Sequence, residues 1–328
     1  MKHSSKTSPH IILYFDILGY KSLLKKGFIC ESDIMHTIAD LNVHITKLTK
    51  TVKNMRIKSL LFSDNCVLCF PYDSCCELLT LFAYVVMCAQ LIQERMLLHG
   101  LFIRGSICVG DVYINNHYVF GEGIIKAYEI ENEVAIYPRI VIDDELINTI
   151  LDCLERLRLR KCVLKTSKLL FPEMLDERNI FSLLFELCEG APRKDAHLRN
   201  SVKARKDYDG QYFVDVLQSI LSRGKIEDIK QVDLMKSCLL NKSFYATHNN
   251  ILYGAEDSSL TDTNLKLCLI CTVTLNALKS NANIPKVKAK YLWICSYINQ
   301  FYKELGLEEP FSSTILRYYL TQNKETSE

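Results

Sequence analysis

Two short stretches of the sequence place a single carboxylate beside apolar residues. In "IILYFDILGYKSLL", residues 11–24, Asp16 ends an apolar run and Gly19 follows it; in "IKSLLFSDNCVLCF", residues 57–70, Asp64 lies between two apolar runs. Two carboxylates brought together repel each other unless a positive charge lies between them. Mg²⁺ is held by one or two carboxylates, with water and substrate phosphates as its other ligands. The pair therefore predicts a divalent-metal site if the two segments are neighbours in the fold.

The turn after Asp16 adds donors for phosphate. Gly19 permits a close backbone approach, and a helix beginning near Tyr20 would offer its first N–H groups to phosphate oxygens. A metal together with such donors is suited to phosphoryl transfer. The alternative is structural: Asp16 would cap the helix and Asp64 would stabilise a turn.

Apolar periodicity predicts the elements that position these residues. Strands are expected at 10–15, 56–62, 65–70, 101–110, 111–123 and 137–143, and helices within 17–50 and at 75–98 and 123–134. The very short connection between 56–62 and 65–70 indicates a hairpin. This mixture of hairpins and crossover helices predicts an α+β fold with helices packed on a sheet.

The second half of the chain has a different pattern. Helix-like apolar spacing recurs at 145–160, 211–222, 226–242, 262–280 and 286–305. We therefore expect a catalytic-type domain at 1–150 and a mostly helical C-terminal region at 151–328, whose role the sequence does not indicate. Asp207 and Asp209 resemble the start of a calcium loop, but Gln211 and Gln218 stand where that loop needs acids, so an Asx turn is expected.

Composition narrows the classes of partner. The chain has 328 residues and a formal net charge of +2, which favours neither nucleic acid nor a membrane surface. Its longest apolar run, 78–92, is shorter than the roughly 20 residues that span a bilayer. The polar N-terminus lacks the apolar core of a secretory signal. We expect a cytoplasmic protein whose 14 cysteines are reduced and mostly buried.

The motifs together resemble class III nucleotide cyclases. "YFDILGY" is similar to the family's first-strand motif, Phe-x-Asp-Ile-x-Gly-Phe, and "LLFSDNCVLCF" to its metal-binding hairpin. "IRGSICVGDVYI" and "VFGEGIIKAYEIE" are similar to its Arg-x-Gly-x-x-x-Gly strand and its Gly-x-x-(x)-Ala-x-x-x-Glu helix. The resemblance covers roughly residues 10–145. It implies a class III cyclase-like sheet and a head-to-tail homodimer, with active sites at the interface.

The resemblance assigns roles to individual positions. Asp16 and Asp64, with the backbone of Ile17, match the ligands of two Mg²⁺ or Mn²⁺ ions. The turn that contacts the triphosphate corresponds to Leu18, Gly19 and Tyr20. In the implied reaction the ribose 3′-hydroxyl attacks the α-phosphorus and pyrophosphate leaves. One ion helps to activate the attacking oxygen and the other holds the β- and γ-phosphates.

The sequence also departs from the purine cyclases. Leu60, four residues before Asp64, stands where they have a Lys or Glu that helps to select the base. Ile125 and Glu129 stand where the family has the Asn and Arg that support the transition state. The nearest candidate cations are Arg104, Lys126 and Arg139, of which Arg104 and Lys126 are our catalytic candidates. Lys58 and Arg56 could reach a base or a phosphate.

These departures bring the chain closer in appearance to the bacterial Pycsar pyrimidine cyclases. Those enzymes make cyclic CMP or cyclic UMP as an anti-phage alarm, and a separate effector protein responds. The first hypothesis is therefore a cyclase acting on a nucleoside triphosphate, CTP or UTP. The alternatives are a non-catalytic nucleotide-binding sensor on a cyclase-like scaffold and another two-metal nucleotidyl transferase.

Overall fold

The structure, a computed structural model, divides the chain into two compact units. One consists of Met1–Arg95 with Phe102–Gln218, and the other of Met96–Leu101 with Ser219–Glu328. Every candidate site residue predicted above lies in the first unit. The residues that the structure describes are 7–21, 43, 57–157, 204–222, 263–312 and 316.

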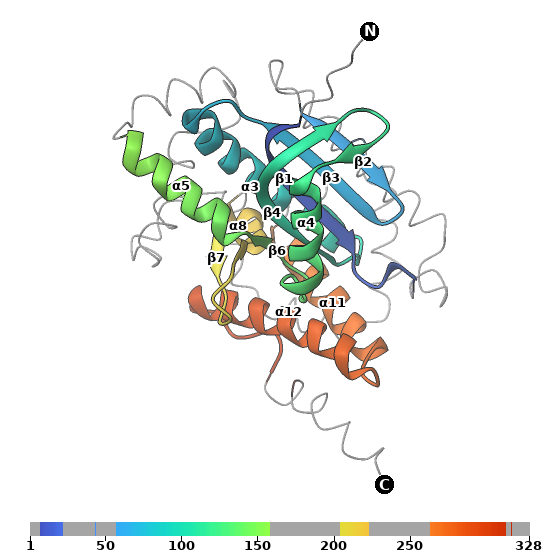
Figure 1. The fold of residues 1–328 in the computed structure, drawn as a ribbon. Coiled ribbons are helices and arrows are strands. Elements are labelled where there is room, and N and C mark those ends of the chain that lie inside the picture. Colours follow the sequence, from blue (N-terminus) through green and yellow to red (C-terminus); the bar gives the residue numbers. More distant parts are fainter. Residues whose placement is uncertain are drawn as a thin grey trace. The chain divides into compact units, whose positions relative to one another are not determined.

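The first unit is built on a mixed sheet (Figure 1). The described strands are β1 Ser8–Ile17, β2 Lys58–Phe62, β3 Asn65–Pro71, β4 Ile103–Ile114, β5 Val119–Phe120, β6 Ile140–Ile142, β7 Ala204–Lys206 and β8 Tyr212–Val214. Their spatial order is β2-β3-β1-β4-β6-β8-β7, and β5 pairs with β4. β1 is antiparallel to β3 and to β4, whereas β6 is parallel to β4. The first strand therefore lies directly beside the hairpin, as the metal-site prediction required.

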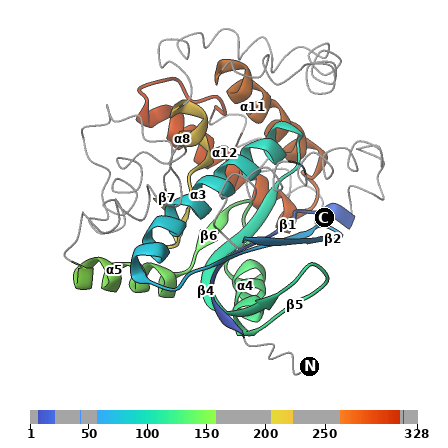
Figure 2. The same cartoon turned by 90° about the horizontal axis from the view of Figure 1, so that it is seen from above.

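Helices cover both faces of this sheet. The described helices that lie wholly or partly in this unit are α3 Cys75–Leu98, α4 Glu122–Glu133, α5 Asp144–Leu157 and α8 Val216–Ser222; the last residues of α3 and α8 belong to the second unit. α3 and α4 lie on opposite faces (Figure 2). On the α3 face, Phe70 packs edge to face against Tyr84. On the α4 face, Ile12, Val67 and Cys108 form a core cluster beneath the helix. A strand covered on both sides is apolar at nearly every position, which explains why β1 does not alternate.

α4 packs closely on β4 through three positions spaced four residues apart, Gly123, Ala127 and Glu131. A Cβ atom added to Gly110 of β4 would lie 2.4 Å from the Cα of Gly123, so the two backbones are almost in contact. The Ser106 hydroxyl donates a hydrogen bond to the carbonyl of Ala127, 2.8 Å away. This spacing places the third position, Glu131, over the site end of β4.

The structure confirms the α+β class and, apart from the helical segment expected within 17–50, the predicted order of elements through β6. The C-terminal part of the unit differs from the prediction. Residues 212–214 form a strand rather than the start of a helix, and this strand pairs with β6. The sheet therefore extends past the expected boundary near 150. Of the helical segment expected within 17–50, only residues 17–21 and 43 are described; the helix expected at 226–242 lies outside the described residues.

α3 is long and apolar enough to pass for a membrane span, yet most of that segment is buried within the structure. It is the core helix that the sequence predicted for 78–92. Eight described cysteines are free and most of them are buried. Cys76, at the start of α3, is disulfide-bonded, which corrects the expectation that all cysteines are reduced.

The second unit contains α11 Thr263–Ser280 and α12 Pro285–Glu304, which pack against each other. Both helices were predicted. Trp293 and Tyr297 stack with ring centroids 5.6 Å apart, and both are buried. The Asn299 side chain pairs with both backbone groups of Phe311, which ties the segment after α12 to the helix.

Candidate functional site

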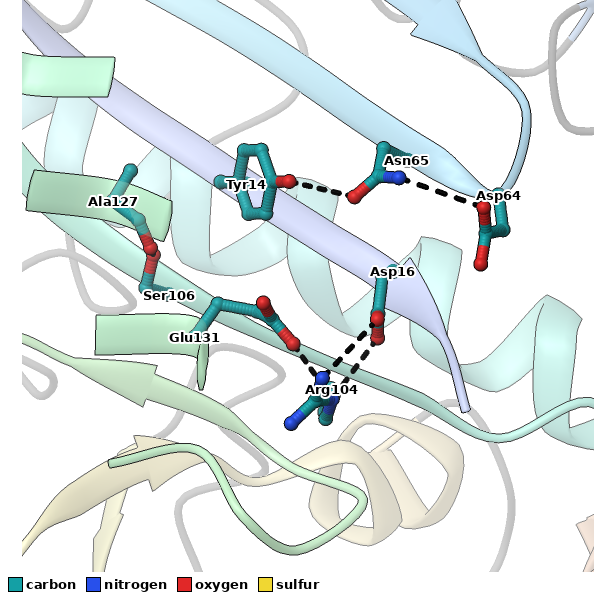
Figure 3. A network of polar contacts seen from close by, with 8 residues as sticks. All are labelled: Tyr14, Asp16, Asp64, Asn65, Arg104, Ser106, Ala127 and Glu131. Carbon is teal, nitrogen blue, oxygen red and sulfur yellow. Dashed lines mark hydrogen bonds and ion pairs between the residues drawn. The ribbon is translucent and has the colours of Figure 1, made fainter. Parts of the chain in front are cut away.

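Asp16 and Asp64 lie at the same edge of the sheet (Figure 3). Asp16, the penultimate residue of β1, is directly opposite Asn65, which begins β3 and follows Asp64. The backbone N–H of Ile17 donates to the carbonyl oxygen of Asp64 over 3.2 Å. This bond joins the end of β1 to the β2–β3 turn, so the main chain itself holds the two acids side by side.

A guanidinium group, contributed by β4, engages the Asp16 carboxylate. Arg104 is opposite Asp16 in the β1–β4 ladder, with Nε 3.2 Å from Oδ1 and Nη2 3.3 Å from Oδ2. The same Nε lies 2.6 Å from Oε1 of Glu131. The side chains of Asp16 and Arg104 are less than one-fifth exposed, and that of Glu131 is 3% exposed. Arg104 thus joins two acids in a largely dry setting, where charge pairing is strong.

A second set of hydrogen bonds orients the side chain of Asn65, which follows Asp64. The Tyr14 hydroxyl donates to Oδ1 of Asn65 over 2.6 Å, which turns the Asn65 amide nitrogen toward Oδ1 of Asp64, 3.5 Å away. Burial raises the pKa of Tyr14 to about 12, with a further contribution from the negative charges of Glu131 and Asp16. Tyr14 therefore keeps its proton at neutral pH and remains a donor.

The turn after β1 has two of its amides already paired. Ile17 donates to Asp64, and the amide of Leu18 donates to the carbonyl of Phe102 over 2.7 Å. Gly19 has φ +75°, a left-handed conformation that favours glycine, and Tyr20 begins a helix. Backbone contacts to a phosphate would therefore start at Gly19, later than the resemblance implies.

Leu60 and Lys58, the two β2 residues expected to contact the nucleotide, face the same side of the sheet as Asp16 but lie at different distances along the strand from the β2–β3 turn. Leu60 is opposite Val67 in the middle of the hairpin and is partly buried. Lys58 is at the far end of β2 from Asp64, and its Nζ donates to the carbonyl of Ile114 over 3.0 Å. The structure does not bring Lys58 to the two acids.

Lys126 is likewise placed away from them. Its Nζ lies 2.5 Å from Oδ2 of Asp143 and 2.6 Å from Oε2 of Glu145. The helical spacing puts Lys126 more than one turn from Glu131 along α4. Arg139, the other candidate cation, is fully buried and pairs with acids of the β7–β8 turn. The structure therefore places Lys126 with Asp143 and Glu145 rather than beside Asp16, and its catalytic role stays a prediction.

Three residues that join the site were not predicted: Tyr14, Asn65 and Glu131. Each had a signal in the sequence. Tyr14 is two residues before Asp16 and so faces the same side of the strand. Asn65 is next to Asp64 in the sequence, and Glu131 follows the small residues Gly123 and Ala127 at the same four-residue spacing on α4. None of these signals identifies a partner before the strand register is known.

The donor set is compatible with Mg²⁺ or Mn²⁺. Asp16 and Asp64 supply two carboxylates from adjoining elements, and Mg²⁺ requires no more than that from a protein when phosphates and water complete its shell. Within the described residues no cluster of three or more His, Cys, Asp or Glu side chains could hold a metal by itself.

Comparisons with known proteins give partial likenesses to solved structures. No protein-family model and no curated protein matches the chain. The chain is similar to the adenylyl cyclase CyaB from P. aeruginosa, with 15% identity and a TM-score of 0.33 over 45% of this chain and 82% of that one. It is also similar to a class III adenylyl cyclase-like ATP-binding protein from Pseudomonas aeruginosa, with 16% identity and a TM-score of 0.30. That match covers 44% of this chain and 35% of that protein.

Proposed function

We propose that the first unit is a metal-dependent nucleotide cyclase that converts a nucleoside triphosphate into a 3′,5′-cyclic mononucleotide and pyrophosphate. One observation carries the proposal: Asp16 and Asp64 are held side by side by the Ile17–Asp64 backbone hydrogen bond, next to a turn with Gly19 in a left-handed conformation. Two Mg²⁺ or Mn²⁺ ions, when bound, would neutralise the phosphates and acidify the 3′-hydroxyl.

The chain's own groups would position the substrate. Asp16, Asp64 and the Ile17 backbone would hold the ions, and the turn from Gly19 to Tyr20 would receive the phosphate oxygens. The paired amides of Ile17 and Leu18 keep that turn in place. A fixed turn lowers the entropic cost of orienting the triphosphate for attack on its α-phosphorus.

CTP or UTP is the proposed substrate. Leu60 has no group that can hydrogen-bond a purine edge, and its partly buried position on the Asp16 face of the hairpin suits an apolar contact with a base. The resemblance to pyrimidine cyclases supports the same choice. In that setting the product would be a cytoplasmic anti-phage signal read by a separate effector protein.

The proposed enzyme is a homodimer whose active sites lie at the interface. Exposed apolar side chains support this assembly: Ile125 and Tyr128 on α4 and Phe62 at the end of β2 are each about half exposed or more. Exposed apolar side chains that adjoin one another often mark a protein contact. The partner copy would supply the groups that recognise the base.

A nucleotide-binding sensor is the second candidate. Two observations favour it: exposed Ile125 and Glu129 occupy the places of the transition-state Asn and Arg, and Arg104 engages both oxygens of Asp16. Such a protein would be stabilised by nucleotide without forming a product.

A product assay separates these functions. Purified protein is incubated with ATP, GTP, CTP or UTP and Mn²⁺, and the products are identified by mass spectrometry. We expect cyclic CMP or cyclic UMP. Thermal stabilisation by a nucleotide with no product would indicate the sensor, and a dinucleotide product would indicate another two-metal nucleotidyl transferase.

A further inference from the structure

Arg104 contacts both carboxylate oxygens of Asp16, the atoms through which a metal ion would bind. The guanidinium approaches both carboxylate oxygens, at 3.2 and 3.3 Å, in the two-pronged geometry that makes Arg–carboxylate pairs strong. A divalent ion on the same carboxylate would lie close to a like charge. Metal binding at Asp16 therefore has to weaken or replace the Arg104 contact.

Glu131 gives Arg104 a place to remain when that happens. Its carboxylate is almost completely buried and lies 2.6 Å from Nε, closer than Asp16. A guanidinium left without a partner in such surroundings would be costly. Because Glu131 stays on the α4 face above β4, Arg104 can leave Asp16 and still be neutralised.

We propose that Asp16 exchanges Arg104 for the metal ion, and that Glu131 retains Arg104 in both states. Arg104 is then an internal counter-charge that protects Asp16 in the metal-free protein and sets how tightly the ion binds. This inference rests on the proposed metal role of Asp16. It assigns Arg104 a positioning role, in place of the catalytic contact with substrate that the sequence suggested.

The test measures Mn²⁺ binding by electron paramagnetic resonance, without nucleotide and at fixed ionic strength. Arg104→Gln alone removes the cation that lies 2.6 Å from the buried carboxylate of Glu131, so the main variant is the double substitution Arg104→Gln/Glu131→Gln. We expect the double variant to bind Mn²⁺ at least about tenfold more tightly than the wild type, because the competing cation is gone. Lys58→Gln removes a cation at the far end of β2 and is expected to change the affinity by less than about twofold.

A second readout follows Arg104 directly. In protein with ¹⁵N-labelled arginine, the Nε–H signal missing from Arg104→Gln identifies Arg104. We expect that signal to shift when Mg²⁺ is added to the wild type. In Asp16→Asn we expect no shift when Mg²⁺ is added.

The outcomes separate this inference from the proposed function. If Asp16→Asn abolishes Mn²⁺ binding but the double variant binds no more tightly than wild type, the exchange is wrong and the metal role of Asp16 stands. If Asp16→Asn leaves Mn²⁺ binding intact, both the exchange and the metal role fail. If the wild type does not bind Mn²⁺ detectably and the double variant does, the exchange is supported in its strongest form.

Discussion

The backbone amide of Ile17 donates to the carbonyl of Asp64 over 3.2 Å, so the main chain sets the distance between two carboxylate-bearing segments. Neither side chain is needed to hold these backbones together. A change from carboxylate to amide at Asp16 or Asp64 should therefore remove charge while leaving the strands paired.

We predict that Asp16→Asn and Asp64→Asn each lower turnover by roughly 100-fold or more, because a neutral amide is a poor ligand for a divalent ion. Initial rates from the product assay give the measurement, and circular dichroism checks the fold. Asp152→Asn, on the exposed side of α5, is the matched control and should retain wild-type turnover. Retained turnover in both site variants would exclude this pair as the metal ligands.

Lys126→Gln should behave differently from the aspartate variants. Its ammonium group is paired with Asp143 and Glu145, so it is held away from Asp16. We expect turnover to fall by less than about threefold, and thermal stability to fall slightly because the partly exposed pairs contribute little. A loss as large as that of Asp64→Asn would show that Lys126 leaves its partners and acts on the substrate.

The contrast between Asp64 and Lys126 shows what the sequence could reveal. Short-range patterns located the hairpin, its turn and the strand before it, because alternation and turn residues act over a few positions. They therefore placed Asp16 and Asp64 at one sheet edge. The partner of Lys126 depends on where β6 and α5 meet α4, and nothing local to "GIIKAYEIE" encodes that contact.

The same reasoning explains why the sequence did not predict strand β8 or the contact between Glu131 and Arg104. β8 has three residues and one residue separates it from α8, so its apolar positions fit a helical period equally well. Glu131 could be read as an exposed helix acid until the register Asp16↔Arg104 places a guanidinium beneath it. Pairing across the sheet, rather than propensity, decides both cases.

We predict that Gly110→Ala destabilises the first unit by about 2 kcal/mol or more, because its new Cβ would lie 2.4 Å from the Cα of Gly123 and push α4 off β4. Urea unfolding gives the measurement. Gly210→Ala is the control: Gly210 has φ +87° and an added Cβ would meet no atom within 4 Å, so alanine there adds backbone strain of about 1 kcal/mol without a clash. Equal losses in the two variants would argue against close helix–strand packing at Gly110.

The β7–β8 turn carries a prediction about acid stability. Arg139 is fully buried and pairs with both Asp207 and Asp209. Burial by itself would raise the pKa of Asp209, but hydrogen bonds from Arg139 and from the backbone of Gln211 outweigh it and lower the pKa below the usual 3.8. A carboxyl group with a lowered pKa in the folded state stabilises the fold above its unfolded pKa. That stability is lost as the pH falls through the folded pKa.

We therefore expect wild-type protein to lose free energy of unfolding below about pH 4, and Asp209→Asn to lose less over the same interval. Near neutral pH the variant should be less stable, because one of the two acids that neutralise buried Arg139 is gone. Chemical denaturation at about pH 7, 5 and 3 measures both effects. Asp152→Asn removes the same charge from an exposed position, so the difference between the two variants isolates the Arg139 contact. Identical pH profiles for Asp209→Asn and wild type would mean that the Arg139–Asp209 pair does not couple protonation to folding.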